Sequence, residues 1–227
     1  MSRNFIKLGL LGLLLAAGSP AQAQAGEVES AEELVRAHYF EGLPYARARR
    51  LTPTGVEALI EILEDPAEAE YHENVVMALG ISGDPQAYRA LSRFHASTPE
   101  GEVGGAEYRA RRAIPLAMGH LARRDERAYQ FLVKRVHATT SPRAPAWRYR
   151  HLSGDRLAGI LRRAAITGVA ISGRPEASAD LGSAEARTRA DSKATDELRR
   201  HIRESRKLSD RVTREGPDRV FGADLSP

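Results

Sequence analysis

The stretch YHENVVMALGISGDPQAYRALSRF, residues Tyr71–Phe94, decides the fold of this chain. Its apolar spacing is typical of two amphipathic helices that meet at a corner of glycine, aspartate and proline. Gly83 suits the left-handed conformation that ends a helix, because it has no Cβ to clash. Asp84 can cap the next helix with its carboxylate, and Pro85 fits a first helical turn, where no amide hydrogen is needed. The stretch therefore predicts a helix pair.

The same corner recurs ninety positions later in the chain. Residues 81–87 read ISGDPQA and residues 171–177 read ISGRPEA, and a weaker middle copy, AMGHLARRDERA, spans residues 117–128. Equivalent places in the three copies are held by Gly80, Gly119 and Gly168. Periods of roughly 40 to 50 residues are those of helical repeats, which tolerate insertions in their loops. We therefore expect about three copies of one helix pair.

Other apolar stripes extend this pattern on both sides. Residues 52–63 carry an apolar face at helical spacing. A separate helix is expected over 125–136, and Asp125 is placed to cap it. Further helices are expected over 106–123, with a kink near Pro115, and over 153–173. No segment alternates with a period of two for long enough to predict a sheet.

The pattern Ala-Leu-Gly-x-x-Gly-Asp-x-x-Ala, residues 78–87, resembles HEAT and HEAT-like repeats, and the resemblance covers residues 52–182. It implies an all-α fold, a right-handed α-solenoid of about three HEAT-like helix pairs with an added C-terminal helix. It also implies protein binding, and it brings no catalytic residues with it.

The N-terminus has the pattern of an export signal. Arg3 and Lys7 precede an apolar run from Leu8 to Ala17, and A-x-A cleavage sites follow. The run is too short to cross a hydrocarbon layer of ~30 Å. We therefore expect a periplasmic or secreted protein with no transmembrane anchor after cleavage. The predicted organisation is a signal peptide (1–25), an N-terminal helical lead (26–51), the repeat domain (52–182), a charged C-terminal helix (183–213) and a disordered tail (214–227).

Charge is divided unevenly along the chain, although the formal net charge is only +4. Residues 26–104 contain 6 Lys and Arg against 15 Asp and Glu, whereas residues 105–184 contain 15 against 6. This split is compatible with an anionic partner, with head-to-tail association of copies, or with a simply solvated surface. Export argues against nucleic acid as the partner. The absence of cysteine excludes disulfides, thiol catalysis and Cys-based metal sites.

Catalytic and metal-binding patterns are missing from the sequence. The seven histidines form no H-x-x-x-H pair, and there is no G-x-S-x-G elbow. Paired carboxylates such as Glu32-Glu33 and Glu64-Asp65 lie where helix ends are expected. We therefore predict no catalytic residues, no metal site and no cofactor, and we interpret the protein as not an enzyme.

The best candidate for a contact surface is Trp147-Arg148-Tyr149-Arg150, where aromatic residues alternate with arginines. The alternative is that Trp147 packs into the edge of the helical stack. The preferred hypothesis is an exported protein-binding scaffold that uses the concave face of a HEAT-like solenoid. Its partner would be a protein or peptide, or else an anionic envelope polymer. The alternatives are a cell-envelope enzyme with the groove as substrate cleft, and a self-associating structural envelope protein.

Overall fold

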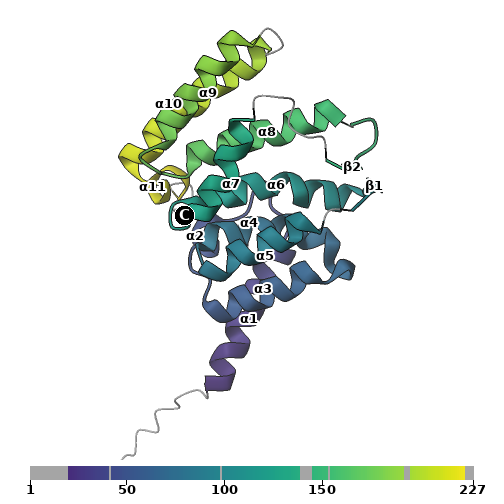
Figure 1. The fold of residues 1–227 in the computed structure, drawn as a ribbon. Coiled ribbons are helices and arrows are strands. Elements are labelled where there is room, and N and C mark those ends of the chain that lie inside the picture. Colours follow the sequence, from purple (N-terminus) through teal and green to yellow (C-terminus); the bar gives the residue numbers. More distant parts are fainter. Residues whose placement is uncertain are drawn as a thin grey trace, which may run out of the picture.

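The computed structural model describes residues 20–40, 42–97, 99–138, 145–152, 154–191 and 195–222. Over these ranges the chain is all-α apart from two strands of two residues each (Figure 1). The helices are α1 (Pro20–Arg36), α2 (Tyr45–Ala48), α3 (Pro53–Glu64), the 3₁₀ helix η1 (Pro66–Tyr71), α4 (His72–Ser82), α5 (Pro85–Ala96), α6 (Gly105–Ala122), α7 (Glu126–Val136), α8 (Gly154–Ile171), α9 (Ala177–Ala190), α10 (Asp196–Glu215) and α11 (Pro217–Phe221). The strands β1 (Gly101–Glu102) and β2 (Trp147–Arg148) pair in parallel.

The corner between α4 and α5 has the predicted geometry. Gly83 is left-handed at φ 71°, and the Asp84 carboxylate accepts a hydrogen bond from the Gln86 amide at 2.8 Å. The Ser82 hydroxyl donates to the Leu79 carbonyl and accepts from the Asp84 amide. The local sequence thus supplies both the turn that ends one helix and the cap that starts the next.

The corner between α8 and α9 makes the same local hydrogen bonds. Gly173 is left-handed at φ 65°, and the Ser172 hydroxyl donates to the Val169 carbonyl at 2.7 Å and accepts from the Arg174 amide at 3.3 Å. Between α6 and α7 there is no glycine, and the Asp125 carboxylate caps α7, as predicted. The helices expected over residues 71–94, 106–123, 125–136 and 153–173 are therefore present as α4/α5, α6, α7 and α8, and α9 follows the second corner.

The closest helix contacts form where glycines replace larger side chains. Helix α6 packs against α4 on one side and α8 on the other, and α10 packs against α8 and α9. A Cβ on Gly80 would lie 2.5 Å from the Cα of Ala117, and a Cβ on Gly119 would lie 2.6 Å from the carbonyl oxygen of Gly168. Since no side chain fits at such distances, glycine allows these helix backbones to touch.

One hydrophobic core runs through most of the molecule. It takes buried residues from α1 and from α3 through α10, among them Val35, Leu59, Val75, Leu91, Ile114, Leu132, Ile166, Leu181 and Ile202. Helix α6 stays continuous through Pro115, which is buried, and the kink expected near it stays a prediction. Over the ranges given above, no helix is both long enough and apolar enough to cross a bilayer.

The C-terminal end differs from the predicted organisation, whereas the signal peptide stays a prediction. Residues 1–19 of the predicted signal peptide lie outside the described residues, and its remainder belongs to α1, which is already helical at Pro20. The charged helix predicted over 183–213 is instead the end of α9 followed by α10, because Thr195 caps a new helix by accepting from the Leu198 amide. Both helices lie side by side at one end of the molecule (Figure 1).

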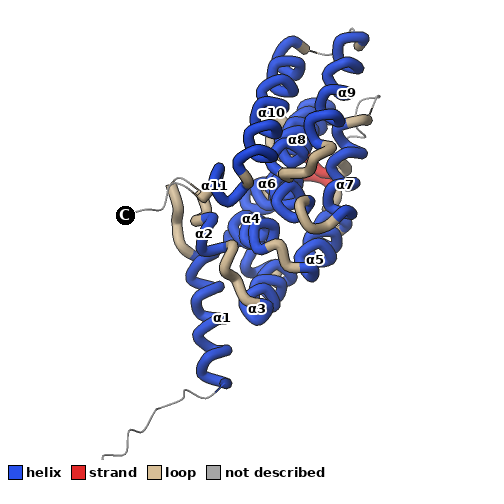
Figure 2. The backbone as a smooth tube through the Cα atoms, turned by 90° about the vertical axis from the view of Figure 1, so that its left-hand side faces the viewer, coloured by secondary structure: helices blue, strands red, loops and turns tan. Residues whose placement is uncertain are grey.

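The prediction of a disordered tail from residue 214 is wrong as far as residue 222. Helix α10 reaches Glu215, and α11 follows with Pro217 buried. Figure 2 shows α11 beside α2, far from it in the sequence. A composition rich in charge therefore did not prevent order here, because the segment finds partners on α2 and α6. Residues 223–227 lie outside the described residues.

Candidate functional site

The two aromatic residues of the predicted contact surface pack inward. Trp147 is only 4 % exposed and forms a small core with Val103 and Leu157. Tyr108 meets the Trp147 ring edge-on and stacks flat on the Tyr149 ring, with centroids 4.3 Å apart. These contacts give Trp147 a packing role at the edge of the helices.

The two arginines of that surface point to solvent. Arg148 is exposed, with its Nε 3.7 Å from a carboxylate oxygen of Glu102. The Arg150 guanidinium lies 5.0 Å from the centre of the Tyr149 ring. A binding role for Trp147, Arg148, Tyr149 and Arg150 stays a prediction, but Trp147 also lines the larger cleft described next.

A cleft of ≈ 690 Å³ lies among α5, α6, α7, α8 and the segment before β2. We call it the basic cleft. Its lining combines the cations Arg111, Lys134, Arg135 and Arg162, the rings of His95, Phe131 and Trp147, and the small or apolar residues Ile114, Pro115, Ala138, Pro145, Ala146, Ala158 and Leu161. Among the described residues that line it there is no Asp or Glu. The cleft therefore presents positive charge above an apolar floor.

Arg135 lies on the wall of the basic cleft and is held by neutral groups. Its guanidinium stands 3.4 Å from the centre of the Phe131 ring, donates to the Phe131 carbonyl at 2.9 Å and lies 2.7 Å from Nε2 of His95. No described carboxylate forms an ion pair with it. Burial lowers the pKa of Arg135 to about 10. The guanidinium is thus partly desolvated without a counter-charge.

His95 adds a ring but little charge to the basic cleft. Burial lowers its pKa to about 4, and the charges of Arg135 and Arg111 act in the same direction. At neutral pH its Nε2 therefore accepts the hydrogen bond from Arg135. The ring meets Phe131 edge-on, with centroids 5.2 Å apart.

Arg162 and Arg111 differ in how many of their hydrogen-bond donors have a partner. Arg162 donates to the Val136 carbonyl at 3.3 Å, and its buried Nε has no hydrogen-bond partner. Burial lowers the pKa of Arg162, while the charge of Asp191 opposes this shift. Arg111 instead is fully engaged, since Glu107 and the carbonyls of α5 and the loop after it accept its hydrogen bonds. Arg135, Arg162 and the exposed Lys134 are therefore the cations that a ligand could use.

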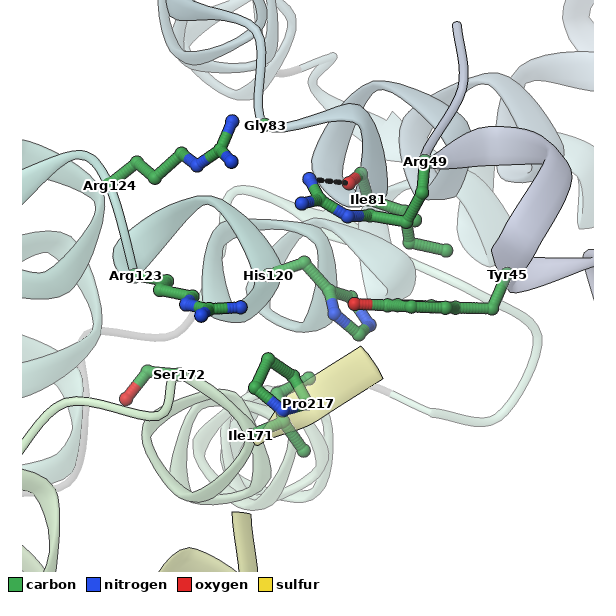
Figure 3. Close-up of a pocket in the computed structure, with 10 residues that line it drawn as sticks. All are labelled: Tyr45, Arg49, Ile81, Gly83, His120, Arg123, Arg124, Ile171, Ser172 and Pro217. Carbon is green, nitrogen blue, oxygen red and sulfur yellow. Dashed lines mark hydrogen bonds between the residues drawn. The ribbon is translucent and has the colours of Figure 1, made fainter. Parts of the chain in front are cut away.

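A second cluster of arginines and rings lies where the C-terminal ends of α4, α6 and α8 meet. Figure 3 shows Tyr45, Arg49 and His120 turned toward one another in this corner. The Tyr45 ring lies 5.7 Å from that of His120 and 5.9 Å from that of Phe221 on α11. Arg49 donates to the carbonyls of Ile81 and Ser82 and so satisfies the end of α4.

Asp218 of α11 completes this second cluster. Its carboxylate accepts a hydrogen bond from the Tyr45 hydroxyl at 3.0 Å and lies 3.4 Å from Arg49 and 3.6 Å from Arg123. We call the set Tyr45, Arg49, His120, Arg123, Asp218 and Phe221 the corner clasp. The space inside the corner is ≈ 10 Å³, which is room for about one water molecule.

Neither cluster could be found from the sequence by a local signal. Arg135 and His95 are 40 positions apart, and Tyr45 and Asp218 are 173 apart. Within the part of the chain that the structure describes, no three His, Asp or Glu side chains are placed to hold a metal ion.

The chain was compared with protein-family models, with curated proteins and with solved structures, and none of the three comparisons finds a match.

Proposed function

We propose that the protein is an exported scaffold that binds a protein or peptide partner, and that the basic cleft is the part of its surface that contacts this partner. The observation that carries the proposal is the lining of the cleft. It joins Lys134, Arg135 and Arg162, none of which forms an ion pair with a carboxylate among the described residues, to aromatic rings and an apolar floor in ≈ 690 Å³. Clefts of this size and composition are typical of ligand and partner sites.

We further propose that the helices form a HEAT-like α-solenoid, built from the pairs α4/α5, α6/α7 and α8/α9. Three observations support this arrangement. Helices α4, α6, α8 and α10 contact one another in series. Glycines stand at the contacts of α4, α6 and α8. The corners at Gly83 and Gly173 contain equivalent hydrogen bonds, made by Ser82 in one and Ser172 in the other. In such a stack each pair buries its apolar face against its neighbours, and insertions between pairs can shape a binding surface.

Binding accounts for the cleft better than catalysis does. General acid–base chemistry needs a group that exchanges protons near neutral pH. His95, whose pKa is lowered to about 4, does not fit that need, and its Nε2 already faces Arg135. The described lining contains no Asp, Glu or Ser that could act beside it. The corner clasp gathers more titratable groups but has room for about one water molecule.

Site-specific photo-crosslinking tests the proposal. We would replace Lys134, exposed at the cleft, with the photoreactive residue p-benzoylphenylalanine and irradiate intact cells of the native host. The matched control carries the same residue at Arg89, which is exposed on α5 and does not line the cleft. We expect an adduct of defined mass from position 134 and none from position 89. Equal adducts from both positions, or none from either, would count against a partner at the cleft.

A further inference from the structure

We infer that the basic cleft receives a short peptide segment that carries a carboxylate and an aromatic side chain about one helical turn apart. This inference rests on the proposed function and names the chemistry of the partner. The corner clasp is the internal precedent, because there a segment of the protein's own chain brings such a carboxylate and ring.

Helix α11 is the internal example. Asp218 and Phe221 lie three positions apart, so both side chains fall on one face of the helix. Asp218 reaches Arg49 and Arg123, while the Phe221 ring meets His120 edge-on with centroids 5.6 Å apart. A carboxylate and a ring on one short segment thus satisfy two guanidinium groups and an aromatic wall.

The basic cleft has the receiving half of this arrangement. Arg135 and Arg162 take the place of the two clasp arginines, and Phe131, with the His95 ring edge-on to it, takes the place of the aromatic wall. In the described part of the chain neither arginine has an ion pair with a carboxylate. The indole of Trp147 borders the cleft but is only 4 % exposed.

The charge state of the cleft favours an anion over a neutral segment. Burial lowers the pKa of both Arg135 and Arg162, so their charged forms are desolvated and weakly compensated. A carboxylate would supply the missing charge through charge-assisted hydrogen bonds, to which the planar guanidinium is well suited. Charge complementarity therefore selects an acidic occupant.

The floor of the cleft favours a peptide over a polyanionic polymer. Ile114, Pro115 and Leu161 offer apolar surface that a sugar phosphate or polyphosphate chain does not match. A segment with an aromatic side chain would bury that ring against this floor and against Phe131. We therefore assign the cleft to an acidic–aromatic peptide.

The protein contains its own reporter for this test, because Trp147 is the sole tryptophan and lines the cleft. We would titrate the full chain with a blocked synthetic peptide that contains Asp-Ala-Ala-Phe and no tryptophan, and follow the indole emission. We expect a saturable change that weakens as salt is added. Replacing the peptide's Asp by Asn, or its Phe by Ala, should each weaken binding by about tenfold.

Variants of the protein locate the binding. Arg135→Gln and Arg162→Gln should each weaken binding by about tenfold, and Lys134→Gln by about threefold, since its charge is exposed. Arg156→Gln is the matched control, because Arg156 is exposed on α8 outside the cleft. Circular dichroism shows whether each variant folds, and Lys134→Gln keeps the test valid if a partly buried arginine cannot be replaced.

Other outcomes overturn the inference. If the Asn peptide bound as tightly as the Asp peptide, the carboxylate would have no role in binding. Stronger binding of polyphosphate, unaffected by loss of the peptide's Phe, would assign the cleft to an anionic polymer. Light scattering that rises with protein concentration at low salt would assign it to the acidic half of a second copy. If position 134 captures a partner that the peptide does not displace, the scaffold stands and the inference fails. Absence of both capture and peptide binding would count against both.

Discussion

The corner clasp and the basic cleft are built from the same kinds of side chain but differ in one component. Each sets guanidinium groups against aromatic rings and a histidine, between helices of different pairs. In the clasp, the Asp218 carboxylate lies between Arg49 and Arg123. In the cleft, neither Arg135 nor Arg162 forms an ion pair with a described carboxylate, although the charge of Asp191 acts on Arg162. A cluster whose cations have a carboxylate partner stabilises the fold. A cluster whose cations lack one can form ion pairs with another molecule instead.

The largest effect is expected where both clusters depend on one helix contact. Helix α6 supplies His120 to the clasp and Pro115 to the cleft, and Gly119 lets it touch α8. Gly119→Ala should lower the free energy of unfolding by about 2 to 3 kcal/mol, because its Cβ would meet backbone. Urea unfolding would measure this loss.

The matched control for that change is Gly159→Ala. Gly159 lies on α8, the helix that Gly119 contacts. A Cβ there would meet nothing closer than the Arg163 guanidinium at 3.8 Å. We expect it to raise stability by up to about 1 kcal/mol through helix propensity. If both changes had equal effects, close backbone contact would not be the common support of the two clusters.

The next effect is a dependence of stability on pH that both clusters share. Burial, together with nearby arginines, lowers the pKa of His95 and of His120 to about 4 from an ordinary value of 6.5. Between these values the unfolded chain binds more protons, so stability falls as pH decreases through this window. We expect a loss of about 1 to 2 kcal/mol per histidine at pH 5 relative to pH 7.5.

Urea unfolding at the two pH values checks this expectation. His120→Asn should remove the contribution of the clasp histidine to the pH dependence of the free energy of unfolding. His95→Asn should remove the contribution of the cleft histidine. An unchanged pH dependence in both variants would show that other groups, such as carboxylates, cause it.

A smaller effect is expected from removing the carboxylate that distinguishes the clasp. Asp218→Asn should lower the free energy of unfolding by about 1 kcal/mol, because its side chain is more than half exposed and water screens its ion pairs. Asp210→Asn, exposed on α10, is the control and should have no effect. Peptide binding at the cleft should not change in either variant, and a change would show that the two clusters are coupled.

The smallest effect is expected for the stability of a cleft variant. Arg135→Gln removes a desolvated cation, and this gain offsets the lost contact with the Phe131 ring. The free energy of unfolding should therefore stay within about 0.5 kcal/mol of the original value. A loss as large as that of Asp218→Asn would show that Arg135 has a structural role, as the clasp arginines do.

The local parts of the fold were predictable because their causes lie within a few residues. The corner at Gly83 and Asp84 and the cap at Asp125 both follow from short motifs. Helix α8 was harder, because it packs against α6, α7 and α10 at once. Ile160 and Leu161 on this helix are only partly buried, while Ile166 is fully buried.

The site was predictable only as an excess of charge. The count over residues 105–184 indicates a basic region, and all four cations of the cleft come from it. Which of them lack partners depends on contacts between residues far apart in the chain, such as Arg135 with His95. The same holds for α11, whose order depends on Tyr45 and Arg49 near the other end.

The link between Tyr45 and Asp218 also has a mechanical consequence. Helices α4, α6 and α8 form a row in which each contacts the next, so small changes at each contact would add up along the row. A bond that joins positions 173 apart resists such accumulated motion. The clasp should therefore stiffen the contacts of α4, α6 and α8 at their C-terminal ends.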